Sequence, residues 1–303
     1  IFLLYEGEIL SDVLILLTNT ALLCLLLRAQ EKNTLKAWAG VGVLLGITIL
    51  GRPNNLLFLP LCFIGCGWAA VRLRALTVIG ACLAVLLPVC MVNYAHDGGF
   101  RITYSGPVNF YIGNASDATG VFATPPSYHA ISQQENKPHA KIHWGRYLRE
   151  DLAAHPAQWV RLIAKKAILF WESGEIPHND NYYIKRAFSP FLRIPLVFGV
   201  IAPIGVIGLL QALSTSSRNR KAVLWLAGYL AVYSISIILV FVLARLRLPA
   251  LAVLIVFASK PLADTLRRLY LCMRYRKRFH HLRPYLRHTA AAWIGAAMLG
   301  SLL

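Results

Sequence analysis

Residues 35–55 read LKAWAGVGVLLGITILGRPNN, and this stretch decides which class of fold is open to the chain. After Lys36 it carries no charge until Arg52, and Thr48 is its one hydroxyl side chain before that point. A helix that crosses the hydrocarbon core of a bilayer needs about 20 mostly apolar residues. The run therefore predicts a membrane helix that ends at a polar connector, residues 52–55.

The composition of the whole chain has the same character. Hydrophobic residues make up 57% of the 303 residues, charged residues make up 15%, and the mean hydropathy is +0.56. A soluble domain of this length needs more polar surface to cover its core, so we expect an integral membrane protein. The net charge of +18 is concentrated beside apolar runs, a pattern that lipid headgroups and topology explain better than a nucleic-acid partner.

Apolar segments that are candidates for membrane helices recur along the chain. They are residues 11–28, 35–51, 55–71, 75–95, 190–213, 222–243, 248–265 and 289–303. Lysine and arginine favour the cytoplasmic side of a membrane, and alternating the spans places the most basic connectors together on that side. Of the thirteen acids, all but Glu31 and Asp264 fall on the opposite side. We therefore expect an all-α polytopic helix bundle with one large extracytoplasmic loop.

This topology divides the chain into five parts. Residues 1–95 hold four helices, 96–189 the loop with an interfacial helix, 190–265 three helices, 266–288 a basic cytoplasmic segment and 289–303 a terminal helix. Glycines within the spans are expected to allow close packing of helices. Five of the six cysteines lie in apolar segments, and no spacing indicates a disulfide framework or a zinc site.

In the loop, the sequence from His155-Pro156 onward predicts an amphipathic helix. Proline is favoured in a first helical turn, and the apolar residues recur at helical spacing opposite Arg161 and Lys165. These apolar residues are Trp159, Leu162, Ile163, Ala167 and Phe170. A helix this short that ends in aromatic residues is expected to lie at the membrane interface instead of crossing it.

Three acids lie close together before or at the start of the first apolar segment: Glu6, Glu8 and Asp12. One interpretation is that Asp12 only favours the helix N-terminus. The alternative is that a carboxylate at the outer end of a span positions an acceptor hydroxyl, acts as a general base or holds a metal. Three acids in seven residues exceed what capping requires, so we take all three as candidate catalytic residues.

Arginines end two other apolar segments on the same expected face, as Arg52, Arg245 and Arg247. Each of them can reach the interface by extending its side chain. However, arginine is disfavoured on the outer face, so these residues call for an anionic partner, either Asp12 or a phosphate, both of which suit the guanidinium fork. We expect Asp12, Arg52 and the Arg245–Arg247 segment to converge on one cavity beneath the loop.

Several short motifs resemble, in their order, the bacterial members of the family 39 glycosyltransferases. This family belongs to the GT-C fold group and includes protein O-mannosyltransferases and the aminoarabinose transferases that act on lipid A. The motifs are residues 5–12 (YEGEILSD), 51–54 (GRPN), 108–114 (VNFYIGN), 155–156 with Lys166 and 170–171, 175–177 with Asp180 and 182–183, and 245–249 (RLRLP).

The resemblance implies a multi-pass enzyme of a bacterial inner membrane, a hexosyl- or pentosyltransferase. Such an enzyme moves a sugar, with inversion, from a polyprenyl-phosphate carrier to a cell-envelope lipid, glycan or protein. Asp12 resembles the acid that these proteins place near the active site, and Arg52 matches a basic position that contacts the donor phosphate. The family's acidic motif in the first outer loop is absent after Ile1, so the chain is expected to be an N-terminally truncated piece.

The loop supplies the candidates for an acceptor pocket: Asn109, Tyr111, Asn114, Glu175 and Asp180. No metal or other cofactor is expected, because His178 and Asp180 lack a third ligand at a convincing spacing. Two other functions remain open, a transporter or flippase of a lipid-linked or anionic substrate and a non-catalytic membrane scaffold. A transporter would be expected to carry charges near the middle of its spans, whereas here they lie at one face.

Overall fold

Most of the described chain is α-helical. The computed structural model describes residues 11–63, 68–97, 99–134, 142–177, 181–193, 197–215 and 220–274. In these ranges strand pairing is limited to one isolated parallel bridge, between Val121 and Val242. The expected terminal helix at 289–303 lies outside the described residues.

Four of the described helices are long and apolar enough to cross a membrane, which indicates a membrane protein. They are α2 (Ser11–Lys32), α4 (Trp68–Asp97), α11 (Arg220–Ile238) and the apolar part of α12 (Leu248–Arg274). Two further apolar helices, α3 (Leu35–Gly51) and α10 (Phe198–Ser214), have 17 residues each. All six coincide with expected spans, although α11 ends and α10 begins several residues inside the expected bounds.

Glycines bring neighbouring helices into close contact, as expected. In α3, Gly42 lies against Val78 of α4, and Gly46 lies against Cys82 and Val85. Neither glycine leaves room for a Cβ atom without a shift. Because both residue numbers rise together along this contact, α3 and α4 run parallel.

The expected helix at residues 55–71 is not a single α-helix. The structure has two 3₁₀-helices, η1 (Pro53–Phe58) and η2 (Pro60–Phe63), and α4 already begins at Trp68. Since α3 and α4 are parallel, the chain must return along the bundle between Arg52 and Trp68. A 3₁₀-helix rises about 2.0 Å per residue against about 1.5 Å in an α-helix, so η1 and η2 span more length per residue than an α-helix would.

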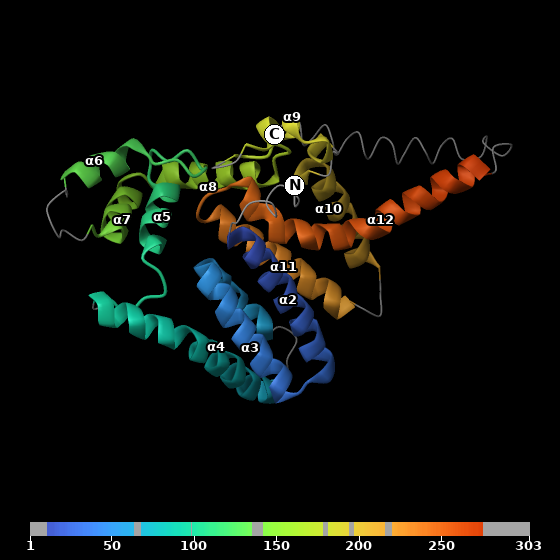
Figure 1. The fold of residues 1–303 in the computed structure, drawn as a ribbon, viewed down its shortest axis with the longest axis horizontal. Helices are drawn as coiled ribbons and strands as arrows, with labels where there is room; N and C mark the ends of the chain where they lie inside the picture. Colours follow the sequence, from blue (N-terminus) through green and yellow to red (C-terminus); the bar gives the residue numbers. More distant parts are fainter. Residues whose placement is uncertain are drawn as a thin grey trace.

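The second half of the bundle follows the same principle. Gly205 and Gly208 of α10 lie against Leu254 and Phe257 of α12, so these two helices are also parallel. The antiparallel α11 links them, and Figure 1 shows α10, α11 and α12 beside the α2–α3 pair. The largest buried side chains of this core include Trp38, Tyr233 and Phe198.

The long polar segment is a helical unit at one end of the bundle. It contains α5 (Ser105–Asn114), α6 (Pro126–Gln134), α7 (Trp144–Ala154), α8 (Pro156–Trp171) and α9 (Tyr182–Phe188). The expected helix after His155 is confirmed: Pro156 lies in the first turn of α8, and Leu162 and Phe170 are buried while Arg161 is exposed. In Figure 1, α8 runs across the ends of the bundle helices.

A cation cluster at the end of the bundle

Asp12, Arg52 and Arg245 form one ion-pair cluster, which confirms that these three residues converge. An Asp12 carboxylate oxygen (Oδ1) lies 2.5 Å from Nη2 of Arg52, and the other (Oδ2) lies 3.3 Å from Nη1 of Arg245. The Asp12 side chain is 3% exposed, whereas those of Arg52 and Arg245 are 17% and 21% exposed. A buried carboxylate therefore holds two guanidinium groups that keep access to solvent.

The local chain geometry explains how Arg52 reaches this position. Arg52 ends α3 in an extended conformation (φ −153°, ψ 106°), and its backbone N–H donates to Thr48 O. Pro53 then begins η1, because its missing N–H and fixed φ suit the first position of a helix. The arginine is thus held at a corner between two helical segments. Arg245 is held in a similar way in η4 (Ala244–Arg247), the short turn before α12.

Polar groups of α11 fix the other side of this corner. The Tyr233 hydroxyl accepts a hydrogen bond from Arg52 Nη1 at 3.4 Å and donates one to Leu246 O at 3.0 Å. The neighbouring Asn54 Nδ2 donates to Ser236 Oγ at 2.9 Å. These bonds connect the α3–η1 corner to α11 and to η4, so the spacing between the two arginines is set by buried contacts.

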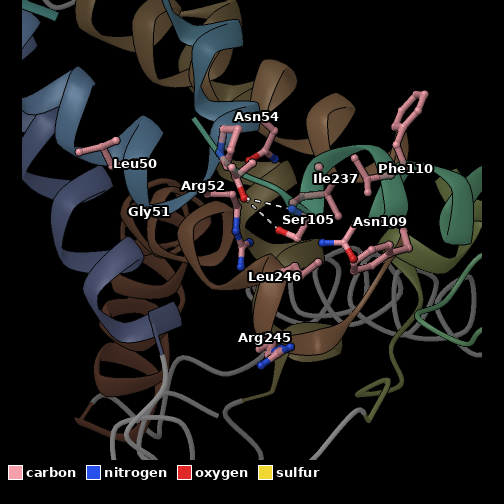
Figure 2. Close-up of a pocket in the computed structure, with 15 residues that line it drawn as sticks. Leu50, Gly51, Arg52, Asn54, Ser105, Asn109, Phe110, Ile237, Arg245 and Leu246 are labelled. Atoms are coloured by element: carbon pink, nitrogen blue, oxygen red, sulfur yellow. Dashed lines mark hydrogen bonds between the residues drawn. The ribbon is translucent and has the colours of Figure 1, made fainter. Parts of the chain in front are cut away.

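A cavity of about 390 Å³ opens beside the cluster. Its walls come from the α3–η1 corner, the start of α5, the end of α11 and η4. The polar lining residues are Arg52, Asn54, Thr103, Ser105, Asn109 and Arg245, and the apolar ones include Phe110, Ile237, Phe241 and Leu246. Figure 2 shows Arg52 extending toward Arg245, with Ser105 and Asn109 beside it.

Two guanidinium groups, those of Arg52 and Arg245, line the cavity and share the buried carboxylate of Asp12. Arginine binds phosphate and carboxylate groups through paired N–H donors, and Ser105 and Asn109 add neutral polar groups. The apolar wall suits the uncharged part of an amphiphilic ligand. The arrangement can therefore bind an anion that carries an apolar or sugar-like group.

Arg247 occupies a different environment from Arg245. Its side chain is 1% exposed and pairs with Glu175 Oε2 at 3.1 Å. Its guanidinium also donates to the carbonyl oxygens of Glu172 at 2.8 Å and Gly174 at 2.5 Å, and it lies over the Phe198 ring. The other oxygen of Glu175, Oε1, accepts from Phe198 N at 2.9 Å. These two expected site residues thus join the polar segment to α10 and do not line the cavity.

Lys166 makes a second buried connection between the polar segment and the bundle. It was not among the candidate site residues. Its ammonium donates to Gly113 O, Asn114 Oδ1 and Val240 O at 2.8–3.0 Å, and the residue is fully buried. Burial lowers the pKa of Lys166 from its usual 10.5 to about 8, because desolvation disfavours the charged form. Lys166 therefore ties α8 to both α5 and the end of α11.

The remaining loop candidates fall into separate groups. Asn109 lines the cavity. Tyr111 does not line it, because its hydroxyl donates to Ser127 Oγ and its ring packs on Trp144, and burial raises the pKa of this phenol. Asn114 is buried with Lys166. Glu6, Glu8 and Asp180 lie outside the described residues.

The structure adds site residues that the sequence reasoning missed. Asn54 and Ser105 line the cavity, and Tyr233 contacts Arg52 from within α11. The available signal for Asn54 was its place directly after Arg52-Pro53. Within the described ranges, no group of three or more histidine, cysteine, aspartate or glutamate residues has the arrangement of a metal site.

The fold and this cluster define a helical protein that has helices long and apolar enough to cross a membrane and a cavity lined by arginines at one end of its bundle. Comparisons with protein-family models, with curated proteins and with solved structures found no match. The geometry of the cavity and its arginines are therefore the features that bear on function.

Proposed function

We propose that the protein is a membrane glycosyltransferase whose cavity binds a polyprenyl-phosphate-linked sugar. The observation that carries the proposal is the Asp12–Arg52–Arg245 cluster, whose two partly exposed guanidinium groups line a partly apolar cavity. A phosphate joined to a lipid and a sugar has the matching parts. Its charge suits the arginines, its hydroxyls suit the Ser105–Asn109 side, and its chain suits the surrounding apolar surface.

In this mechanism the arginines stabilise the phosphate as it leaves the sugar. Negative charge develops on the leaving oxygen in the transition state, and fixed cations stabilise it most in a site with little water. Asp12 positions both arginines, since each of its oxygens contacts one guanidinium. For Asp12 to activate the acceptor hydroxyl, one of its carboxylate oxygens would have to release its arginine and contact the acceptor hydroxyl instead.

The proposed orientation places the cavity and the helical polar segment on the extracytoplasmic side of a bacterial inner membrane. The basic connectors support this orientation. A transporter or flippase would bind the same anion, but the cluster lies at the ends of α3 and α12 and not near their middle. The position of the cluster thus favours a reaction at the membrane surface over transport of a substrate through the bundle.

The decisive assay is transfer of a labelled sugar from polyprenyl-phosphate donors in membranes that contain the protein. Arg52→Ala should reduce donor binding by roughly ten- to a hundredfold, the loss of one charge-assisted contact. Arg52→Lys should lose less, because it keeps the charge without the fork. Asp12→Asn should lower turnover. Arg161→Ala, on the exposed face of α8, is the matched control.

Two results would contradict the proposal. Donor binding and transfer that survive both Arg52→Ala and Asp12→Asn would remove the cluster from the site. Donor binding that depends on Arg52 without any transfer to an acceptor, together with movement of the lipid between leaflets, would support a flippase.

A further inference from the structure

The last part of α12 leaves the helix bundle. Its first part packs on α10, where Gly208 lies against Phe257 and Pro261. Beyond Pro261 every residue to Arg274 is exposed except Thr265 and Cys272, which are partly or fully covered. Figure 1 shows α12 bending past its middle, with its end running across the direction of α2 and α3. A proline within a helix is a common cause of such a bend.

This exposed part carries an apolar stripe. Leu262, Leu266, Leu269 and Met273 follow one another at intervals of four, three and four residues, so they lie on one helix face. Their exposed fractions are 44%, 57%, 43% and 71%. A row of large apolar side chains with this exposure is unfavourable in water, and within the described chain no other element covers it.

The charged residues lie on the other side of the same helix. Lys260, Asp264, Arg267 and Arg274 are spaced at intervals of four, three and seven residues, roughly opposite the apolar stripe. With Arg268 they give four basic residues against one acid. The sequence then continues with further arginines and a lysine in residues 276–278. The helix is therefore amphipathic, with a strongly basic polar side.

We propose that residues 262–274 lie in the plane of the membrane surface and bind anionic lipid headgroups. The apolar stripe enters the boundary between headgroups and acyl chains, and the arginines contact lipid phosphates. An amphipathic helix with a basic polar face has the chemistry of such a surface. The apolar first part of α12 keeps the helix beside the bilayer, which makes the lipid surface its nearest partner. This inference uses none of the cavity residues.

The test compares two labels on opposite sides of the helix. The full chain, with its native cysteines replaced, is placed in nanodiscs of phosphatidylcholine with or without phosphatidylglycerol. A polarity-sensitive fluorophore is attached at Leu269→Cys on the stripe or at Leu271→Cys on the charged side. In discs with phosphatidylglycerol, the label at 269 should show blue-shifted emission and resist aqueous iodide, whereas the label at 271 should be quenched.

The arginines should set the dependence on lipid charge. Each of Arg267→Gln and Arg268→Gln should lower the ratio of docked to undocked helix about fivefold in phosphatidylglycerol discs, with little change in neutral discs. Arg161→Gln on α8 is the control, because it removes the same charge from an exposed residue of a different helix. Equal quenching of both labels in charged discs would overturn the proposal. Protection that ignores phosphatidylglycerol, or that appears only with two protein copies in a disc, would also overturn it.

Discussion

Arg245 and Arg247 are two residues apart, yet they belong to different regions of the molecule. Arg245 faces the cavity, is 21% exposed and shares Asp12 with Arg52. Arg247 is 1% exposed and is enclosed by Glu175 and by backbone carbonyl oxygens of the polar segment. The difference shows that the residue type alone does not mark a binding site. An arginine whose terminal Nη groups donate to fixed protein oxygens stabilises the fold, whereas one that keeps solvent access beside a cavity can bind a ligand.

Lys166 belongs with Arg247 in this comparison. Both are buried cations that contact backbone carbonyl oxygens, and both join the polar segment to the bundle. Both involve the connector between α11 and α12, since Lys166 donates to Val240 O and Arg247 itself lies in η4. In the same connector, Val242 N donates to Gly120 O and Ala244 N to Ile176 O. Since this connector carries Arg245, the buried cations hold the wall on which the cavity arginine sits.

Arg247→Ala is expected to have the largest effect on stability. Removing one member of a buried ion pair leaves an uncompensated charge, here Glu175, and typically costs about 3–5 kcal/mol. Arg247→Lys should recover part of this loss, because the charge stays while the fork is lost. The measurement is denaturant or thermal unfolding in detergent. An Arg247→Ala protein as stable as the wild type would place Arg247 with the cavity arginines.

Lys166→Met should cause the next largest loss of stability, on the order of 2–4 kcal/mol in the free energy of unfolding. The reason is that Gly113 O, Val240 O and Asn114 Oδ1 each lose a donor in a buried site. Methionine keeps a similar volume, so the change reports on the polar contacts.

The same lysine predicts a dependence on pH. Its pKa is about 8 when folded and 10.5 as the ordinary value, so the unfolded chain binds more protons between these values and stability rises with pH across this window. As pH falls from 10.5 toward 8 that gain is lost, and below about 8 it is absent. The rise should be smaller in Lys166→Met, measured as the difference between the two proteins from pH 7.5 to 10.5. Parallel curves would show that Lys166 does not titrate in this way.

The convergence of Asp12, Arg52 and Arg245 could be predicted because topology alone places them at one end of the spans. Which of Arg245 and Arg247 faces the cavity could not be predicted, since the partners of Arg247 in the polar segment are more than 70 residues away in sequence. The sequence did hold a signal for Lys166. Leu162, Lys166 and Phe170 are spaced four residues apart, which puts the lysine on the apolar face of α8.

The segment at residues 55–71 illustrates a different limit. Its hydropathy fits any backbone that packs inside a membrane protein, so composition predicted a span without fixing the type of helix. Pro60 was the available signal, because proline inside an α-helix removes a hydrogen bond and clashes with the preceding turn. The closeness of η1 to α11, seen in the stacking of Phe58 on Tyr229, depends on tertiary packing that a single sequence does not reveal.

Arg245→Ala is expected to have the smallest effect on stability, on the order of 1 kcal/mol, because the pair is partly exposed and Asp12 keeps its contact with Arg52. Its effect on ligand binding should be larger, about tenfold for the polyprenyl-phosphate donor, since one guanidinium is lost from the cavity. Unfolding and donor binding measured on the same preparations separate the two effects. Arg247→Lys should show the reverse pattern, with lower stability and nearly normal donor binding in the protein that folds. If Arg245→Ala lowers stability as much as Arg247→Ala and leaves donor binding unchanged, both arginines are structural, and the anion site must be sought elsewhere.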